Sequence, residues 1–126
     1  AMDAPKLDAL AYGKTEPQHH HAAFTQADID AHLAVLPDWR YVADDVTFPR
    51  GRIVKNFHFK NYYETIAFVN IVASISHVTD HHPDLSVHFS RCEVSYNTHD
   101  VGHGQGGISN NDFICAARIE VAHRLL

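Results

Sequence analysis

The sequence has few cysteines, no long hydrophobic run and no excess of basic residues. Its two cysteines, Cys92 and Cys115, each lie in an apolar pattern without a CxxC or metal-type partner nearby. We therefore expect two buried, reduced thiols, as suits a reducing compartment. No apolar run approaches the roughly 18 residues of a membrane span, and the N-terminus lacks a signal-peptide core. We expect a cytoplasmic protein, with the nucleus left open.

Basic residues are outnumbered, because 10 Lys and Arg stand against 15 Asp and Glu, for a formal net charge of -5 with neutral histidines. Direct nucleic-acid binding needs a basic surface that displaces counterions, so this composition argues against it. Histidine is abundant, with 12 in 126 residues. An unperturbed imidazole titrates at about 6.5, so these side chains can exchange protons near neutral pH.

The length of 126 residues fits one domain. Residues 1–22 lack sustained periodicity and contain Pro5, Gly13 and Pro17. This composition predicts a flexible N-terminal tail, and we interpret the three consecutive histidines within it as tail rather than as a metal site. Residues 23–126 are then expected to form a single domain.

Three helices are predicted from capping signatures. Their N-caps are expected at Thr25, Asn61 and Ser109, each followed three residues later by Asp or Glu. The second helix should end between Asp80 and His82, because Pro83 disfavours helical geometry at the residue before it. Its apolar stripe is expected to contain the following residues: Ile66, Val69, Val72, Ala73 and Ser76.

Strands are predicted between these helices. A short strand or turn is expected near Trp39 and Tyr41, and residues 46–59 read as a strand pair or one bent strand. Apolar and polar residues then alternate over 85–89 and 92–96. The predicted fold is a two-layer α+β structure, in which about three helices cover one face of a four-stranded antiparallel sheet.

The candidate site lies between residues 77 and 99, which include His77, His81, His82 and His99. His77 and His81 are four residues apart and so share one face of a helix. His82 follows at the helix end, and His99 stands at the end of a strand. We expect these four side chains to converge in one pocket.

Three chemistries fit this cluster. Imidazoles without a Ser or Cys nucleophile suit proton transfer without a covalent intermediate, as in elimination of water or tautomerisation. The His-x3-His spacing also fits zinc, with His99 or Asp112 as a further ligand, although the Glu of an HExxH motif is missing. Alternatively, histidines near a helix end only satisfy its last carbonyls. Asp112 can likewise serve as a cap of the last helix.

The pattern of these residues resembles the signature of the pterin-4a-carbinolamine dehydratases. It consists of His77-x3-His81-His82-Pro83, then Phe89, Thr98-His99 and Asp112. The resemblance covers roughly residues 24–124. It implies a small α+β fold, dimers that often pair into tetramers, and no metal or organic cofactor. It also implies a hydro-lyase that removes the 4a-hydroxyl of a 4a-hydroxytetrahydropterin as water, giving a quinonoid dihydropterin and recycling tetrahydrobiopterin.

The resemblance assigns roles to individual residues. His81, His82 and His99 are the catalytic candidates, with His81 and His99 as acid and base. Asp112 would orient His99, and His77 occupies a position that is often a carboxylate in this family. The implied substrate-binding residues are as follows: His82, Pro83, Asn97 and Thr98.

Two other functions stay open from the sequence. Some members of the family also act as dimerisation partners of a homeodomain transcription factor, which would make the chain an interaction module. A metal-dependent hydrolase is the third hypothesis.

Overall fold

The computed structural model describes residues 4–43 and 46–126. Its helices are α1 (Ala4–Ala11), α2 (Gln26–Leu33), α3 (Tyr62–Thr79) and α4 (Asn110–His123). Its strands are β1 (Arg40–Val42), β2 (Arg52–His58), β3 (Asp84–Val87) and β4 (Arg91–Tyr96). Within the described part of the chain, no helix is both long and apolar enough to cross a membrane.

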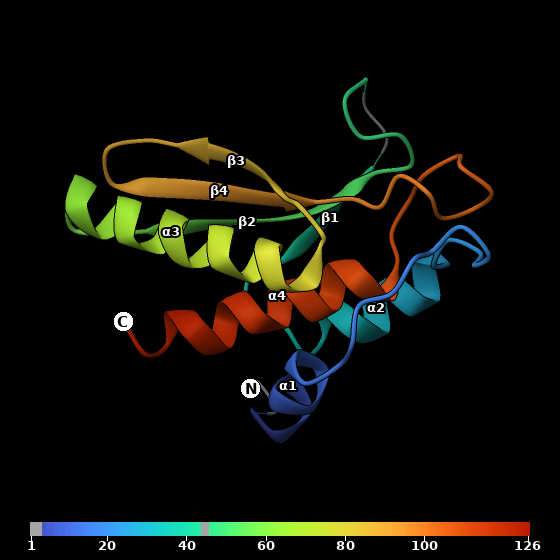
Figure 1. Ribbon diagram of the computed structural model, residues 1–126, viewed down its shortest axis with the longest axis horizontal. Helices are drawn as coiled ribbons and strands as arrows, with labels where there is room; N and C mark the ends of the chain where they lie inside the picture. The colour runs from blue at the N-terminus through green and yellow to red at the C-terminus, as the bar shows by residue number, and fades with distance from the viewer. Residues whose placement is uncertain (1–3, 44–45) are drawn as a thin grey trace.

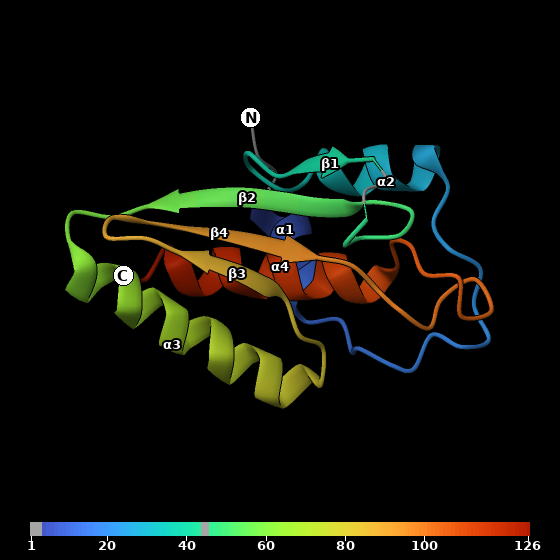
Figure 2. The ribbon, with the colours of Figure 1, turned by 90° about the horizontal axis from the view of Figure 1, so that it is seen from above.

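The four strands form one antiparallel sheet in the order β1-β2-β4-β3. Figure 1 shows α3 and α4 on the same side of this sheet, and Figure 2 shows the sheet lying over α4. The predicted α+β class with a four-stranded antiparallel sheet is confirmed. The structure adds one helix, α1, which packs against α4.

The core lies between the sheet and α4. Alternate residues of β2 and β4 face the helices, and the central pairs are Ile53 with Tyr96 and Phe57 with Cys92. Cys115 of α4 is also fully buried, and both cysteines are free, which confirms the sequence prediction. Burial raises the pKa of each thiol to about 11, so both thiols are protonated at neutral pH.

One charged residue lies on the inward face of β2. Lys55 stands between the buried Ile53 and Phe57, and its Nζ contacts both carboxylate oxygens of Glu120 on α4, at 2.8 and 3.0 Å. The two side chains are only 11% and 6% exposed. The ion pair therefore joins the sheet to α4 in a largely dehydrated place.

The predicted helix starts are confirmed. Thr25 and Ser109 form capping boxes with Asp28 and Asp112, and Asn61 accepts a hydrogen bond from the third residue of α3. At the other end of α3, Asp80 has left-handed backbone angles (φ 51°, ψ 39°). This conformation ends the helix and turns the chain just before the paired histidines.

Two details of the strand and helix predictions are wrong. Residues 46–48 form no strand, because the chain turns through Arg50 and Gly51, both with positive φ, and β2 begins only at Arg52. On one side β2 pairs with β1, which lies where a short strand or turn was expected. The buried stripe of α3 is also rotated from the predicted one and contains the following residues: Thr65, Phe68, Val72, Ser76 and Thr79.

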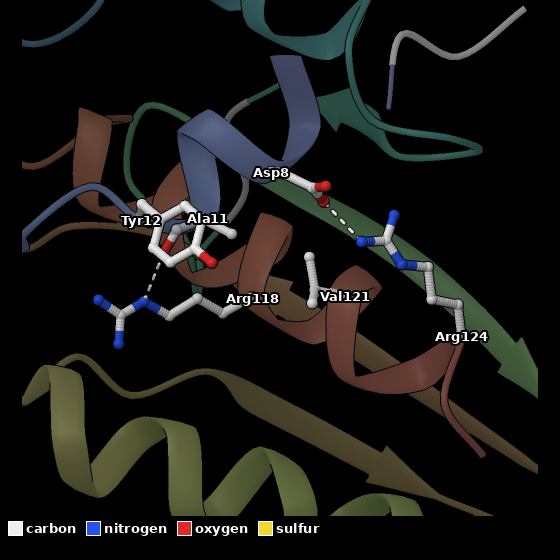
Figure 3. Close-up of a pocket in the computed structure, with 6 residues that line it drawn as sticks. All are labelled: Asp8, Ala11, Tyr12, Arg118, Val121 and Arg124. Atoms are coloured by element: carbon white, nitrogen blue, oxygen red, sulfur yellow. Dashed lines mark hydrogen bonds and ion pairs between the residues drawn. The ribbon is translucent and has the colours of Figure 1, made fainter. Parts of the chain in front are cut away.

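The N-terminal segment differs from the flexible tail that the sequence suggests. Leu7 of α1 is buried, and Arg118 of α4 donates hydrogen bonds to the carbonyls of Ala11 (3.0 Å) and Gly13 (2.9 Å). Ala11 and Arg118 also border a cavity of about 410 Å³ that Figure 3 shows between α1 and α4. The partners of α1 lie about a hundred residues away, so no local pattern could indicate the docking.

Candidate active site

The end of α3 and the end of β4 meet at one pocket, here called the histidine pocket. It has a volume of about 330 Å³. Its lining consists of Asp80, His81, His82, Asn97, Thr98, His99 and Asp100. Residues far apart in the sequence are brought together because β3 leads away from the end of α3 and β4, antiparallel to β3, runs back towards it.

His81 is the most firmly held imidazole of the pocket. Its Nε2 lies 2.6 Å from Oδ1 of Asp112, and its ring stacks on Tyr96 with centroids 5.5 Å apart and planes 10° apart. The His81 side chain is 12% exposed and the Asp112 side chain is fully buried. The pair is therefore preorganised, with one ring nitrogen bound to a carboxylate and the ring plane fixed by an aromatic neighbour.

Asp112 is held by the protein on its other oxygen. Oδ2 accepts hydrogen bonds from the Thr98 hydroxyl (2.8 Å) and from the Ser109 backbone N–H (2.9 Å). An ionised carboxylate only accepts hydrogen bonds, so this set of donors indicates that His81 donates its Nε2–H to Asp112. The proton-accepting atom of a neutral His81 is then Nδ1.

The partner of Asp112 differs from the one that the resemblance implied. Asp112 is bonded to His81, whereas His99 is an exposed residue of the pocket. The glycine-rich loop of residues 100–108 does not prevent this contact, because Thr98 and Gly107 exchange backbone hydrogen bonds (2.8 and 3.0 Å) across its base. The two ends of the loop are therefore held together, and the chain that follows the loop places Asp112 beside His81.

Of the remaining predicted site residues, one lines the pocket and two do not. His82 lines the pocket and is exposed. His77 is exposed on α3 and is not among the lining residues, and Pro83 follows the pocket without lining it. Across residues 4–43 and 46–126, no group of three His, Cys, Asp or Glu side chains is arranged to hold a metal ion.

Comparison with known proteins identifies the family. Residues 22–122 match the family model described as Pterin 4 alpha carbinolamine dehydratase. The chain belongs to this dehydratase family. A protein of Bdellovibrio bacteriovorus named as a dehydratase of this kind is 50% identical over 98 residues, which are 78% of this chain and 76% of the relative. A similarly named protein of Nitrosospira multiformis is 44% identical over 120 residues, 94% and 96% of the two chains.

Solved structures support the same fold. A transcriptional coactivator/pterin dehydratase from Brucella melitensis superposes with a TM-score of 0.66 at 22% identity, over 79% of this chain and 96% of that one. A pterin dehydratase-like protein described as a RuBisCO assembly factor in the alpha-carboxysome gives 0.53 at 20% identity, over 84% and 94% of the two chains. The predicted membership of the dehydratases, a family of hydro-lyases, is confirmed.

Three residues in or beside the histidine pocket were not singled out from the sequence. Tyr96 lay at the end of the predicted alternation over 92–96 without a role, yet its ring stacks on His81, and burial raises the pKa of its hydroxyl well above 10. Asp80 and Asp100 flank the histidines and line the pocket. Their positions directly before His81 and directly after His99 were the available signal.

Proposed function

We propose that this protein dehydrates a 4a-hydroxytetrahydropterin to the quinonoid dihydropterin and water by histidine acid-base catalysis, which recycles tetrahydrobiopterin. The observation that carries this proposal is the His81–Asp112 pair beside His82 and His99 in one pocket. Family membership supplies the reaction class. No metal or organic cofactor enters the proposed reaction.

The pair supports one division of the two proton transfers between His81 and His99. His81 takes the proton from N5 of the pterin on Nδ1, and Asp112 stabilises the imidazolium that forms. Hydroxide is a poor leaving group, so protonated His99 gives a proton to the 4a-hydroxyl while the C4a–O bond breaks. The N5–H electron pair forms the N5=C4a double bond and water departs. One proton moves from N5 to the hydroxyl overall, and His82 positions the substrate.

Asn97 is the strongest substrate-binding candidate among the pocket residues. Its Nδ2 donates to the carbonyls of Gly51 (2.6 Å) and Pro49 (3.2 Å), which fixes the amide. Its Oδ1 is buried, and the described residues offer it no hydrogen-bond partner. An N–H of the pterin ring would satisfy this acceptor. The Thr98 hydroxyl, by contrast, is bonded to Asp112, so Thr98 acts by holding the pair.

The test is the dehydration rate of freshly generated 4a-hydroxytetrahydropterin. Wild type should accelerate it, and a folded His81→Ala/His99→Ala variant should lose most of the acceleration, since each proton transfer contributes roughly 10²–10⁴-fold. His88→Ala is the matched control, because His88 is exposed and, among the described residues, is bonded only to Ser86 and the local backbone. Chelator should have no effect. Absence of acceleration by wild type would sink the proposal.

A role as a protein-binding module is the second candidate. Large apolar side chains are exposed on α3 and after β3, including Tyr63 (86%), Val78 (78%) and Phe89 (68%). Such surfaces favour contact with another chain. A homodimer or homotetramer is our expectation, and a transcription-factor partner would use the same surface. Sedimentation of the pure protein tests this, because a monomer at micromolar concentration would contradict self-association.

A further inference from the structure

A second cavity adjoins the histidine pocket. It has a volume of about 290 Å³ and shares Asp80, His81 and Asp100 with the histidine pocket. Its other lining residues are Thr15, Glu16, Pro17, Thr79 and Asn111. Because His81 borders both cavities, a substrate whose ring occupies the histidine pocket can extend a substituent into the second one.

The outer wall of the second cavity is the N-terminal segment 15–18, which is bonded to three parts of the fold. The Asn111 side chain accepts from the Glu16 N–H (3.1 Å) and donates to the Glu16 carbonyl (2.7 Å). The Gln18 N–H donates to Oδ2 of Asp100 (2.9 Å). The Thr15 hydroxyl donates to a carbonyl in the last turn of α3 (2.7 Å). The wall is therefore a built part of the site.

The lining has one sign of charge. Glu16, Asp80 and Asp100 contribute carboxylates, and the lining contains no Lys or Arg. His21 lies beside Glu16 at the surface, with its Nε2 3.5 Å from the Glu16 carboxylate. Carboxylates accept hydrogen bonds from hydroxyl and N–H groups, whereas they repel phosphate and carboxylate groups. The cavity thus favours a neutral substituent that carries hydrogen-bond donors.

We propose that this second cavity is a specificity subsite, which takes an uncharged, hydroxyl-bearing substituent of the pterin and disfavours an anionic one. The inference rests on the proposed dehydratase function and assigns Glu16 and Asp100 as specificity-determining residues. Pterins share a ring system and differ in the substituent that it carries. A site beside the reacting ring that recognises the substituent therefore decides which pterin is used.

The experiment compares three 4a-hydroxytetrahydropterins, with a dihydroxypropyl, a methyl or a phosphorylated hydroxyalkyl substituent. Wild type should show the lowest KM for the dihydroxypropyl compound. Glu16→Gln and Asp100→Asn should each raise that KM about three- to tenfold, because an amide is a weaker acceptor than a carboxylate. Glu16→Gln should also leave kcat and the KM for the methyl compound unchanged, and both variants should lower the KM for the phosphorylated compound.

The control is Asp30→Asn, which makes the same charge change at an exposed position of α2. Glu16 lines only the second cavity, so Glu16→Gln separates its effect from any change in the histidine pocket. Unchanged discrimination in folded variants, with wild type active on all three compounds, overturns this inference alone. A preference of wild type for the phosphorylated compound also overturns this inference alone. Inactivity of wild type on every compound overturns the proposed function and the inference with it.

Discussion

At the scale of single residues, Asp112 performs two tasks with its two oxygens. Oδ2 closes the capping box with the backbone N–H of Ser109, and Oδ1 holds the imidazole of His81. The sequence indicated a cap and a contact with a histidine, and both occur. The family resemblance implied His99 as the partner, whereas the structure shows His81, because which histidine reaches Asp112 depends on how the end of α3 lies against α4.

Replacing Asp112 by Asn should mainly affect the chemical step. An amide cannot stabilise the imidazolium of His81 as a carboxylate does, so we expect kcat to fall by about 10²-fold or more, with a small change in KM. The measurement is the dehydration rate as a function of pH, made on protein whose circular dichroism matches that of wild type.

The control for this variant is Thr98→Val. It keeps the shape and removes one donor to the Asp112 carboxylate, so it should reduce kcat less than Asp112→Asn does. If Asp112→Asn keeps the kcat of wild type, the pair is structural and the mechanism needs another base.

At the scale of elements, Lys55 and Glu120 join β2 to α4. Lys55→Met alone leaves the Glu120 carboxylate unpaired, and Glu120→Leu alone leaves the Lys55 ammonium unpaired. These side chains are only 6% and 11% exposed, respectively. We expect each single variant to lower the free energy of unfolding by about 3–5 kcal/mol, and the double variant to be close to wild type or more stable. Urea unfolding of the four proteins measures the coupling between the two residues.

The comparison for this cycle is the exposed pair of Arg124 and Asp8, whose side chains are 42% and 43% exposed. Arg124→Met should cost no more than about 1 kcal/mol, as is usual for surface ion pairs. Additive losses in the Lys55 and Glu120 variants would show that the two charges are solvated independently.

The helices were predicted better than the connections between them. A capping box is a pattern of four consecutive residues, so the sequence around Thr25 and Ser109 was enough to identify the starts of α2 and α4. The turn before β2 was mistaken for a strand, because Val46 to Phe48 has strand-type composition but pairs with no strand in the part of the chain that the structure describes. The docking of α1 depends on Arg118, which no local window contains.

At the scale of the whole molecule, stability should decline in alkali. The unfolded thiols of Cys92 and Cys115 ionise near pH 9.0, whereas burial raises their pKa in the folded protein to about 11. Between these values the unfolded chain binds fewer protons than the folded one, so the free energy of unfolding falls as pH rises. Below about pH 9 this contribution to stability is fully present.

Urea unfolding at a series of pH values from neutral to about pH 11 measures this effect. A Cys92→Ala/Cys115→Ala variant should show a shallower decline, and the part that remains should come largely from Tyr96, whose pKa burial also raises. An equally steep decline in the double variant would contradict the thiol contribution.

The structure brings most of the predicted site residues to one pocket. His81, His82, Asn97, Thr98 and His99 line one pocket, because the sheet returns the end of β4 to the end of α3. His77 does not line the pocket. The helix ends at Thr79, so His81 lies beyond it and the two side chains do not share a helix face. Spacing along the chain indicated the pocket, whereas the pairing within it required the tertiary structure.

The attachment of the N-terminal segment has a practical consequence for anyone who trims or tags this protein. A shortened chain cut to the family-matched residues 22–122 would keep every histidine of the pocket. It would lack Thr15, Glu16 and Pro17, and Asn111 would lose its partner. Rates measured on such a fragment would describe an enzyme with one side of its site open to water. An affinity tag or surface attachment is better placed at the C-terminus, which Figure 1 shows at the opposite end of α4 from its junction with the glycine-rich loop.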